Sequence, residues 1–249
     1  MSRVPTGIGR LDELMSGGFP KGSIIIVCGP PGSGKTILSM QIALNLAKNG
    51  RNILYLLTGI EDEADLIAQA ESLGMNFSKQ LEGKIIIKKV RKEVEMRKVL
   101  KDASASGFSV VIIDSISNFM RKAWEANELK ERILVRNNMI VEVLNPEFII
   151  RNVIRKLLHY LRQLKFDLTI LTSDRIKGEH GYTLDKISEF MADGIIELDT
   201  TRINGTFRRT LRIIKLKKTN HSMMPISFSI KSKKGIIFLN ERTGNITQN

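Results

Sequence analysis

The sequence Gly29-Pro30-Pro31-Gly32-Ser33-Gly34-Lys35-Thr36 decides the fold, because it matches the phosphate-binding pattern GxxxxGK[ST]. Residues 22–28 before it are mostly apolar and predict a buried strand. Residues 35–48 after it carry apolar side chains at helical spacing, and Gly50 suits the end of that helix. With a second apolar strand at 53–57, the segment predicts a βαβ unit whose first loop binds phosphate.

Each residue type in this loop has a physical role in binding a nucleotide. Glycines let backbone N–H groups converge on phosphate oxygens, and the helix N-terminus adds its dipole. Lys35 supplies a mobile positive charge for the β- and γ-phosphates, and the hydroxyl of Thr36 is placed to ligate Mg²⁺. We therefore expect ATP or GTP, with ATP the first choice, and Mg²⁺ to bind at one continuous segment: Gly29, Pro30, Pro31, Gly32, Ser33, Gly34, Lys35, Thr36 and Ile37.

Polar side chains at the ends of two later strands are candidates for the same site. Asp114 follows the apolar run 110–113 and fits the acid that orients the water shell of Mg²⁺. Ser173 follows the predicted strand 168–172, and we expect its hydroxyl to sense the γ-phosphate. Both assignments depend on the phosphate loop, because many strands end in Asp or Ser.

Hydrolysis also needs a group that polarises the attacking water. A carboxylate that ends the strand next to the phosphate-loop strand suits this task, and we take 53–57 as that strand. Glu61 is the first candidate for the base and Glu63 the second. The alternative is that these acids only favour the N-terminus of the helix predicted at 62–73.

Strands and helices alternate along most of the chain, which predicts an α/β fold with a mostly parallel sheet covered by helices. The pattern changes after Gly194, where residues 195–201 and 206–216 predict an antiparallel hairpin around Asn204-Gly205. Residues 226–230 and 235–239 predict a second hairpin. No repeat or low-complexity linker divides the sequence, so we expect one domain over 1–249.

The positive charge is concentrated near the end of the sequence. The 249 residues include 39 Lys and Arg against 26 Asp and Glu, a formal charge of +13. Residues 200–249 hold 11 of these basic residues and a single acid, Glu241. Such a basic region attracts polyanions such as nucleic acid, or it is simply a solubilising or thermally adapted surface.

Cysteine content and hydropathy exclude two classes of protein. The lone Cys28 cannot form an internal disulfide, which excludes a disulfide-stabilised secreted scaffold. The longest apolar runs have the length of strands and are too short to span a membrane. No apolar signal segment is visible either, so we expect a cytoplasmic protein without a membrane partner.

Several motifs together resemble the KaiC-like branch of the RecA/RadA ATPases. The resemblance begins with Val4-Pro5-Thr6-Gly7, Leu11-Asp12-Glu13-Leu14, Gly17-Gly18-Phe19 and the phosphate loop. It continues through Asp114-Ser115, residues 171–175, 192–196 and 208–217, and then Thr219 and His221. The resemblance implies a RecA-like core that hydrolyses ATP, and it covers nearly the whole chain.

Three departures from this family pattern shape the expected activity. Where the family often has paired glutamates, this chain has Ile60-Glu61, so we expect weak hydrolysis. The family's Lys-x-Arg pair, which reaches the nucleotide of a neighbouring subunit, is Lys215-Leu216-Lys217 here. The pair implies catalytic roles for Lys215 and Lys217 and a homo-oligomer with nucleotide at the subunit interface. Residues 121–145 look longer than their family counterpart and are a candidate insertion.

Within this family the sequence most resembles archaeal RadA paralogues, which bind single-stranded DNA and adjust recombination. This resemblance implies single-stranded DNA, and a RadA-type recombinase, as partners. The expected DNA contacts lie in the segments after Asp114 and Ser173: Arg121, Lys122, Arg132, Arg136, Arg175 and Lys177. The alternatives are a KaiC-like signalling ATPase that acts through protein partners, and an interaction module that binds nucleotide with almost no hydrolysis.

Overall fold

The computed structural model describes residues 2–77, 83–125, 133–136, 139–143, 146–176, 178–203 and 205–239. Its elements in chain order are β1 (Arg3–Val4), α1 (Gly9–Leu14), β2 (Phe19–Pro20), β3 (Ser23–Gly29), α2 (Lys35–Lys48), β4 (Ile53–Leu57), α3 (Glu63–Ser72), β5 (Ile85–Lys89), α5 (Glu93–Ala105), β6 (Val110–Asp114), α6 (Ile116–Glu125), β7 (Ile133–Arg136), β8 (Met139–Val143), α7 (Pro146–Gln163), β9 (Leu168–Asp174), α8 (Ser188–Met191), β10 (Gly194–Ile203), β11 (Thr206–Leu216), β12 (Ile226–Lys231) and β13 (Gly235–Phe238).

The central sheet confirms the predicted fold class. Its nine strands follow the order β13-β12-β11-β10-β3-β9-β6-β4-β5. The six strands from β10 to β5 run parallel to one another, while β11, β12 and β13 pair antiparallel at one side. This is an α/β RecA-like arrangement with antiparallel hairpins at its C-terminal side.

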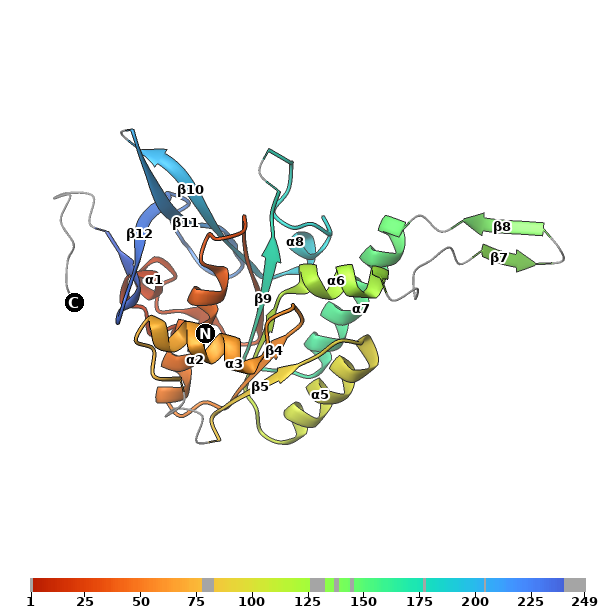
Figure 1. Ribbon diagram of the computed structural model, residues 1–249, viewed down its shortest axis with the longest axis horizontal. Helices are drawn as coiled ribbons and strands as arrows, with labels where there is room; N and C mark the ends of the chain where they lie inside the picture. Colours follow the sequence, from red (N-terminus) through yellow and green to blue (C-terminus); the bar gives the residue numbers. More distant parts are fainter. Residues whose placement is uncertain are drawn as a thin grey trace.

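The strands separate two hydrophobic cores because successive side chains point to opposite faces of a sheet. Ile25 and Val27 of β3 pack with α2 and α3 on one face. Ile26 and Cys28 pack with α5, α6 and α7 on the other face (Figure 1). Burial, with a smaller contribution from the charge of Glu197, raises the pKa of the Cys28 thiol to about 12, so this cysteine is an inert part of the core.

The register of the parallel strands brings several carboxyl ends to one edge of the sheet. Gly29 at the end of β3 pairs with Asp174 at the end of β9, and Leu57 of β4 pairs with Asp114 of β6. Ligands of open parallel sheets bind outside these carboxyl ends. The edge that carries the phosphate loop is therefore the place to look for the functional site.

One predicted neighbour relation is wrong. β4 is not next to β3 in the sheet: β9 and β10 flank β3, whereas β4 lies between β6 and β5. The order of strands along the chain differs from their order in the sheet because the connection through α2 carries the chain from β3 past the positions of β9 and β6 to β4.

The stretch after Asp114 contains more regular structure than the sequence analysis expected. α6 runs to Glu125, and β7 and β8 form an antiparallel pair that lies apart from the main sheet (Figure 1). The sequence analysis named residues 121–145 only as a candidate insertion and predicted no helix or strand there. Among the described helices, none is both long and apolar enough to cross a lipid bilayer.

The C-terminal strands contact the helix that follows the phosphate loop. Gln41 of α2 accepts a hydrogen bond from the backbone N–H of Ile236 in β13 at 2.7 Å. A Cβ at Gly34 would meet the side chain of Ile230 in β12 at 3.2 Å. The antiparallel strands thus pack against the start of α2.

Candidate nucleotide-binding site

The glycine-rich loop joins β3 to α2 and exposes backbone N–H groups at the helix N-terminus. Gly34 precedes the helix with a φ of 106°, a left-handed conformation that favours glycine. A Cβ at Gly29 would overlap the carbonyl oxygen of Leu198, so the strand can enter the loop only without a side chain there. Ser33 Oγ is buried and has no hydrogen-bond partner among the described residues. Such a hydroxyl is satisfied by a phosphate oxygen, and the residues present fit a nucleotide.

Lys35 lies at the predicted phosphate site with its charge already engaged. Its Nζ donates to the carbonyl oxygens of Gly29 at 2.9 Å and Pro30 at 3.1 Å. The third contact is an ion pair with Asp174 Oδ1 at 3.0 Å. An ammonium group has three N–H donors, so these contacts use all of them. Asp174 belongs to the motif that named Ser173, yet the sequence analysis gave it no role.

Asp114 is held by two hydroxyl groups, one from each neighbouring strand. Tyr55 Oη donates to Asp114 Oδ2 at 2.9 Å, and Thr172 Oγ1 donates to Oδ1 at 2.5 Å. Burial, and then the charge of Asp114 and their hydrogen bond, raises the pKa of Tyr55 well above its usual value, so it remains a donor. Thr36 follows Lys35 in the first turn of α2. One carboxylate and one hydroxyl suit Mg²⁺, which keeps several waters and binds together with phosphates.

Tyr55 and Thr172 are functional candidates that the sequence analysis missed. A signal for Tyr55 was available, because a phenol in a fully buried strand needs a hydrogen-bond partner. Thr172 lies within the motif at residues 171–175, but the sequence analysis gave the role of γ-phosphate sensor to Ser173.

Ser173 lies on the wrong face of the sheet for the predicted sensor. Its hydroxyl is buried and lies 3.3 Å from Ser117 Oγ of α6. Side chains alternate along β9, so Thr172 and Asp174 share the α2 face while Ser173 points to the α6 face. The structure thus brings Thr172, and not Ser173, to Asp114.

Glu61 reaches the functional edge although β4 is distant from β3. Partial burial, followed by the negative charges of Asp114 and Asp65, raises the pKa of Glu61. Glu63 begins α3, where Asp62 and Asp65 form a reciprocal capping box. Glu61 therefore remains the first candidate for the base, because the charge of Asp114 acts on its carboxyl group.

Lys217 lies at the opposite end of the parallel strands. Its backbone N–H donates to the carbonyl oxygen of Asp193, whose own N–H donates to that of Ile24 at the start of β3. The phosphate loop starts five residues later at Gly29, roughly 16 Å away at a rise of about 3.3 Å per residue. Lys217 therefore does not lie at the phosphate site of its own chain.

Lys215 lies on the same side as Lys217. Its Nζ donates to the carbonyl oxygens of Glu189 at 3.1 Å and Phe190 at 3.3 Å. Partial burial, and then the charge of Lys217, lowers the pKa of Lys215. Two adjacent cations thus repel one another at a surface far from the phosphate loop of this chain.

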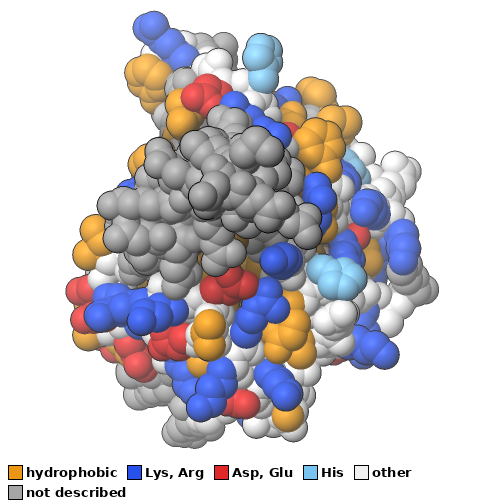
Figure 2. Space-filling model, turned by 90° about the vertical axis from the view of Figure 1, so that its right-hand side faces the viewer, with side chains coloured by type: hydrophobic (Ala, Val, Ile, Leu, Met, Phe, Trp, Pro, Cys, Tyr) orange, Lys and Arg blue, Asp and Glu red, His pale blue; other side chains and the backbone are white. Residues whose placement is uncertain are grey.

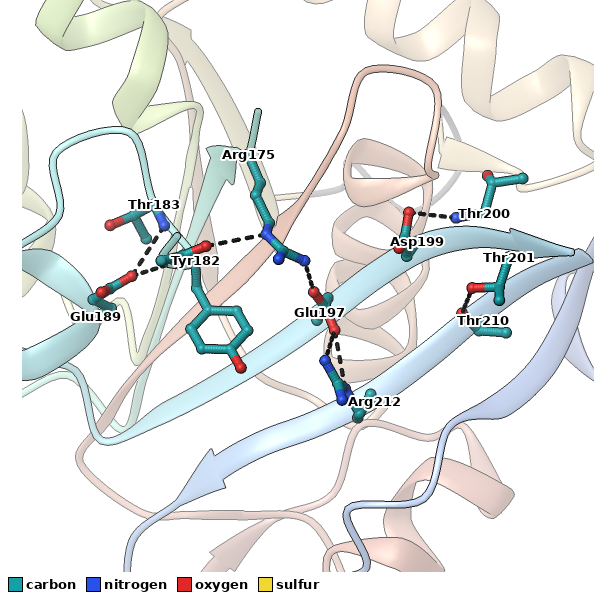
Figure 3. A network of polar contacts seen from close by, with 11 residues as sticks. Arg175, Tyr182, Thr183, Glu189, Glu197, Asp199, Thr200, Thr201, Thr210 and Arg212 are labelled. Atoms are coloured by element: carbon teal, nitrogen blue, oxygen red, sulfur yellow. Dashed lines mark hydrogen bonds and ion pairs between the residues drawn. The ribbon is translucent and has the colours of Figure 1, made fainter. Parts of the chain in front are cut away.

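The residues predicted to bind DNA do not form a described groove. Arg175 pairs with Glu197, stacks on the ring of Tyr182 and donates to the carbonyl oxygen of Gly181 (Figure 3). Arg121 is exposed on α6. Basic side chains visible on the face in Figure 2 are scattered among acidic and hydrophobic ones. Lys122 and Arg136 have side chains outside the described residues, and Arg132 and Lys177 lie wholly outside them.

Glu197 is the centre of a buried ion triad next to β3. Its carboxylate is 5% exposed and accepts from Arg175 and, at 2.7 Å, from Arg212 Nη2 of β11 (Figure 3). Glu197 pairs in register with Cys28, the residue before the phosphate loop. Two arginines more than neutralise one buried carboxylate, and the triad ties the residue after β9 to β10 and β11 behind the loop.

Comparisons of this chain with a family model, with curated proteins and with solved structures all find KaiC or KaiC-like proteins. A family model described as "ATPase: KaiC" matches residues 4–243. The KaiC-like protein PH0186 of Pyrococcus horikoshii has a crystal structure that superposes with a TM-score of 0.78 at 29% identity, over 96% of this chain and 99% of that one. A UPF0273 protein of Thermotoga maritima is 28% identical over 97% of this chain and 98% of its own.

A longer relative is the circadian clock protein KaiC2 of Synechocystis. It is 27% identical over 92% of this chain, which spans 39% of the length of that protein. None of these relatives carries a name that refers to RadA or to recombination, so the narrower resemblance to RadA paralogues is not supported.

Proposed function

Because this chain belongs to the KaiC ATPase family, we propose that it is an Mg²⁺-dependent ATPase that acts as a nucleotide-controlled switch through protein partners. The observation that carries the proposal is the meeting of Lys35, the unpartnered Ser33 hydroxyl and the doubly held Asp114 at one edge of the sheet. This combination serves a charged phosphate ligand and a divalent cation, and it has no other evident purpose in the core.

The proposed roles follow from the positions of the side chains. The loop N–H groups and Lys35 bind the phosphates, while Thr36 and Asp114 hold Mg²⁺, which would neutralise charge on the phosphate oxygens. Tyr55 and Thr172 keep the Asp114 carboxylate in one orientation. Glu61, with its raised pKa, accepts the proton of the attacking water.

We also infer that two copies of the chain complete one site. Lys215 and Lys217 lie at the end of the sheet opposite to their own phosphate loop, so they contribute to hydrolysis only at the nucleotide of a neighbouring copy. Their mutual repulsion is relieved when a phosphate group of that neighbour approaches. The proposal therefore includes a homo-oligomer with nucleotide at the interface.

Protein partners are preferred to DNA for a structural reason. Binding of single-stranded DNA needs a continuous basic groove with stacking side chains. Among the described residues, Arg175 is engaged by Glu197 and the remaining predicted contact, Arg121, is a single exposed cation. The DNA-binding and recombination roles, including a recombinase partner, therefore do not enter the proposal.

The test compares ATP binding and turnover in the wild type and in Lys35→Ala. We expect the wild type to bind and slowly hydrolyse ATP with Mg²⁺, and Lys35→Ala to bind ATP roughly 100-fold more weakly because a buried charge contact is lost. Lys48→Ala is the matched control, because Lys48 is an exposed lysine in the last turn of the same helix. Equal ATP affinity in Lys35→Ala and Lys48→Ala would overturn the proposal.

A further inference from the structure

Asp174 has no role in the function proposed above. Its carboxylate nevertheless forms an ion pair with Lys35, the cation that this function needs most. Its Oδ1 lies 3.0 Å from Lys35 Nζ. The side chains of Lys35 and Asp174 are 10% and 27% exposed. Solvent therefore screens this ion pair only partly, and the pair competes with any other anion for Lys35.

The carboxylate of Asp174 is held in place by its backbone. The N–H of Asp174 donates to Ser117 Oγ at 2.8 Å, and the N–H of Arg175 donates to the carbonyl oxygen of Gly29 at 3.1 Å. The guanidinium of Arg175 is anchored in turn by Glu197, as Figure 3 shows. Because the N–H groups of Asp174 and Arg175 are tied to α6 and β3, the backbone holds the Asp174 side chain beside Lys35.

A phosphate group must take Lys35 away from this partner. All three N–H donors of Lys35 are in use, two by loop carbonyl oxygens and one by Asp174. The two carbonyl oxygens are neutral, so the charged contact is the one that opposes transfer of the ammonium to a phosphate. Asp174 is exposed enough to be hydrated once Lys35 has left.

We propose that Asp174 is an internal competitor of the nucleotide, which holds Lys35 in the nucleotide-free protein and thereby lowers the affinity for ATP. This inference rests on the proposed function. Through this competition the protein sets the ATP concentration to which it responds, since the phosphates must first open the Lys35–Asp174 pair. Asp174 is thus an affinity-setting residue of the site, although it need not touch the nucleotide.

The experiment is a double-mutant cycle read by titration with N-methylanthraniloyl-ATP. Asp174→Asn keeps the size of the side chain and removes its charge. We expect Asp174→Asn to lower the Kd roughly 5- to 10-fold in the presence of Lys35, and to change it by less than about 2-fold in the Lys35→Ala background. A general repulsion between Asp174 and the phosphates would instead persist in both backgrounds.

The matched control lies directly before the same strand. Asp167 precedes β9 at its other end and is paired with Lys21 at 3.1 Å and Arg51 at 2.7 Å. Asp167→Asn removes the same charge and an ion-paired carboxylate, and we expect it to leave the Kd unchanged. Asp174→Thr is a second uncharged variant for the case in which Asp174→Asn folds poorly, as judged by circular dichroism.

Three outcomes overturn the inference: unchanged or weaker ATP binding in the uncharged Asp174 variants, an equal gain in the Lys35→Ala background, or an equal gain in Asp167→Asn. Failure of the proposed function looks different. In that case the folded wild type shows no ATP binding at all. If the wild type binds ATP but Asp174→Asn binds it no better, only the competitor role is lost.

Discussion

The carboxylates at the two ends of the parallel strands differ in their partners. At the amino-terminal end, Asp193 is paired with Arg162 at 3.0 Å and with Lys217 at 3.4 Å. Burial alone would raise the pKa of Asp193, but the hydrogen bonds from Arg162 and the Ile24 N–H, with the nearby cations, lower it. At the carboxyl end, the pKa of Glu61 is raised, and among the described residues Asp114 has hydroxyl partners but no ion pair.

The difference shows which end is built for a ligand. Asp167 and Asp193 are neutralised by basic side chains within the protein. Asp174 pairs with Lys35, whereas Asp114 has only hydroxyl partners among the described residues, and its charge raises the pKa of Glu61. A carboxylate without a cationic partner is a place where a divalent cation can supply the missing charge. This contrast supports the Mg²⁺ role proposed above for Asp114.

The largest effect on ATP turnover should come from a change at the carboxyl end of the strands, in the candidate base. Glu61→Gln keeps the shape of the side chain and removes its basic oxygen, so we expect ATP turnover to fall roughly 100-fold or more. Glu63→Gln, two residues away in the first turn of α3, should retain turnover. A steady-state ATPase assay decides between them, and full activity in Glu61→Gln would remove the assignment.

The raised pKa of Glu61 also gives this prediction a pH dependence. A base must be deprotonated, so turnover falls as the pH drops through the raised pKa, at a higher pH than for an ordinary glutamate. Asp65→Asn removes one of the charges that raise this pKa, and it should move the acid limb of the pH profile to lower pH. A limb that moves to higher pH would contradict the proposed cause.

An intermediate effect is expected from the amino-terminal end, where Lys217 acts only on another copy. Lys217→Ala should lower turnover roughly 10- to 100-fold, since a lysine gives weaker transition-state help than an arginine. Mixing Lys217→Ala with Lys35→Ala should restore part of the activity, because one copy supplies the intact phosphate loop and the other the lysine. If the mixture stays as inactive as its components, the shared site is refuted.

The smallest effect should come from the hydroxyl that orients Asp114. Tyr55→Phe removes one hydrogen bond to a charged acceptor, so we expect the Mg²⁺ concentration for half-maximal turnover to rise roughly 3- to 10-fold. Tyr160→Phe is the control, because its hydroxyl donates to the carbonyl oxygen of Arg97 on the far side of the sheet. An unchanged Mg²⁺ requirement with a lower maximal rate would show that Tyr55 does not act through the metal.

The sequence predicted most of the fold and the continuous part of the site. β3, the glycine-rich loop and α2 are local features, so buried-strand composition, glycines and helical spacing were sufficient to place Lys35 and Thr36. The C-terminal hairpins were predicted equally well, because the residue pair Asn204-Gly205 is typical of a hairpin turn and the flanking strands β10 and β11 pair antiparallel.

The parts that the sequence could not supply depend on how strands lie across the sheet. The contacts of Tyr55 and Thr172 with Asp114 join three strands, and the pair between Lys35 and Asp174 joins α2 to β9. The face on which Ser173 lies depends on the register of a single strand, where a shift of one residue reverses the assignment. The position of β4 relative to β3 follows from sheet order, which no local pattern records.

The hydrogen bond between Gln41 and Ile236 gives the C-terminal strands a mechanical connection to the site. The same helix carries Lys35 at its first position, and β12 lies against Gly34 just before it. The contacts of β12 and β13 therefore converge on the N-terminal half of α2, the part of the helix that carries Lys35. The position of this helix end is thus set by the last two strands of the sheet as well as by the glycine-rich loop.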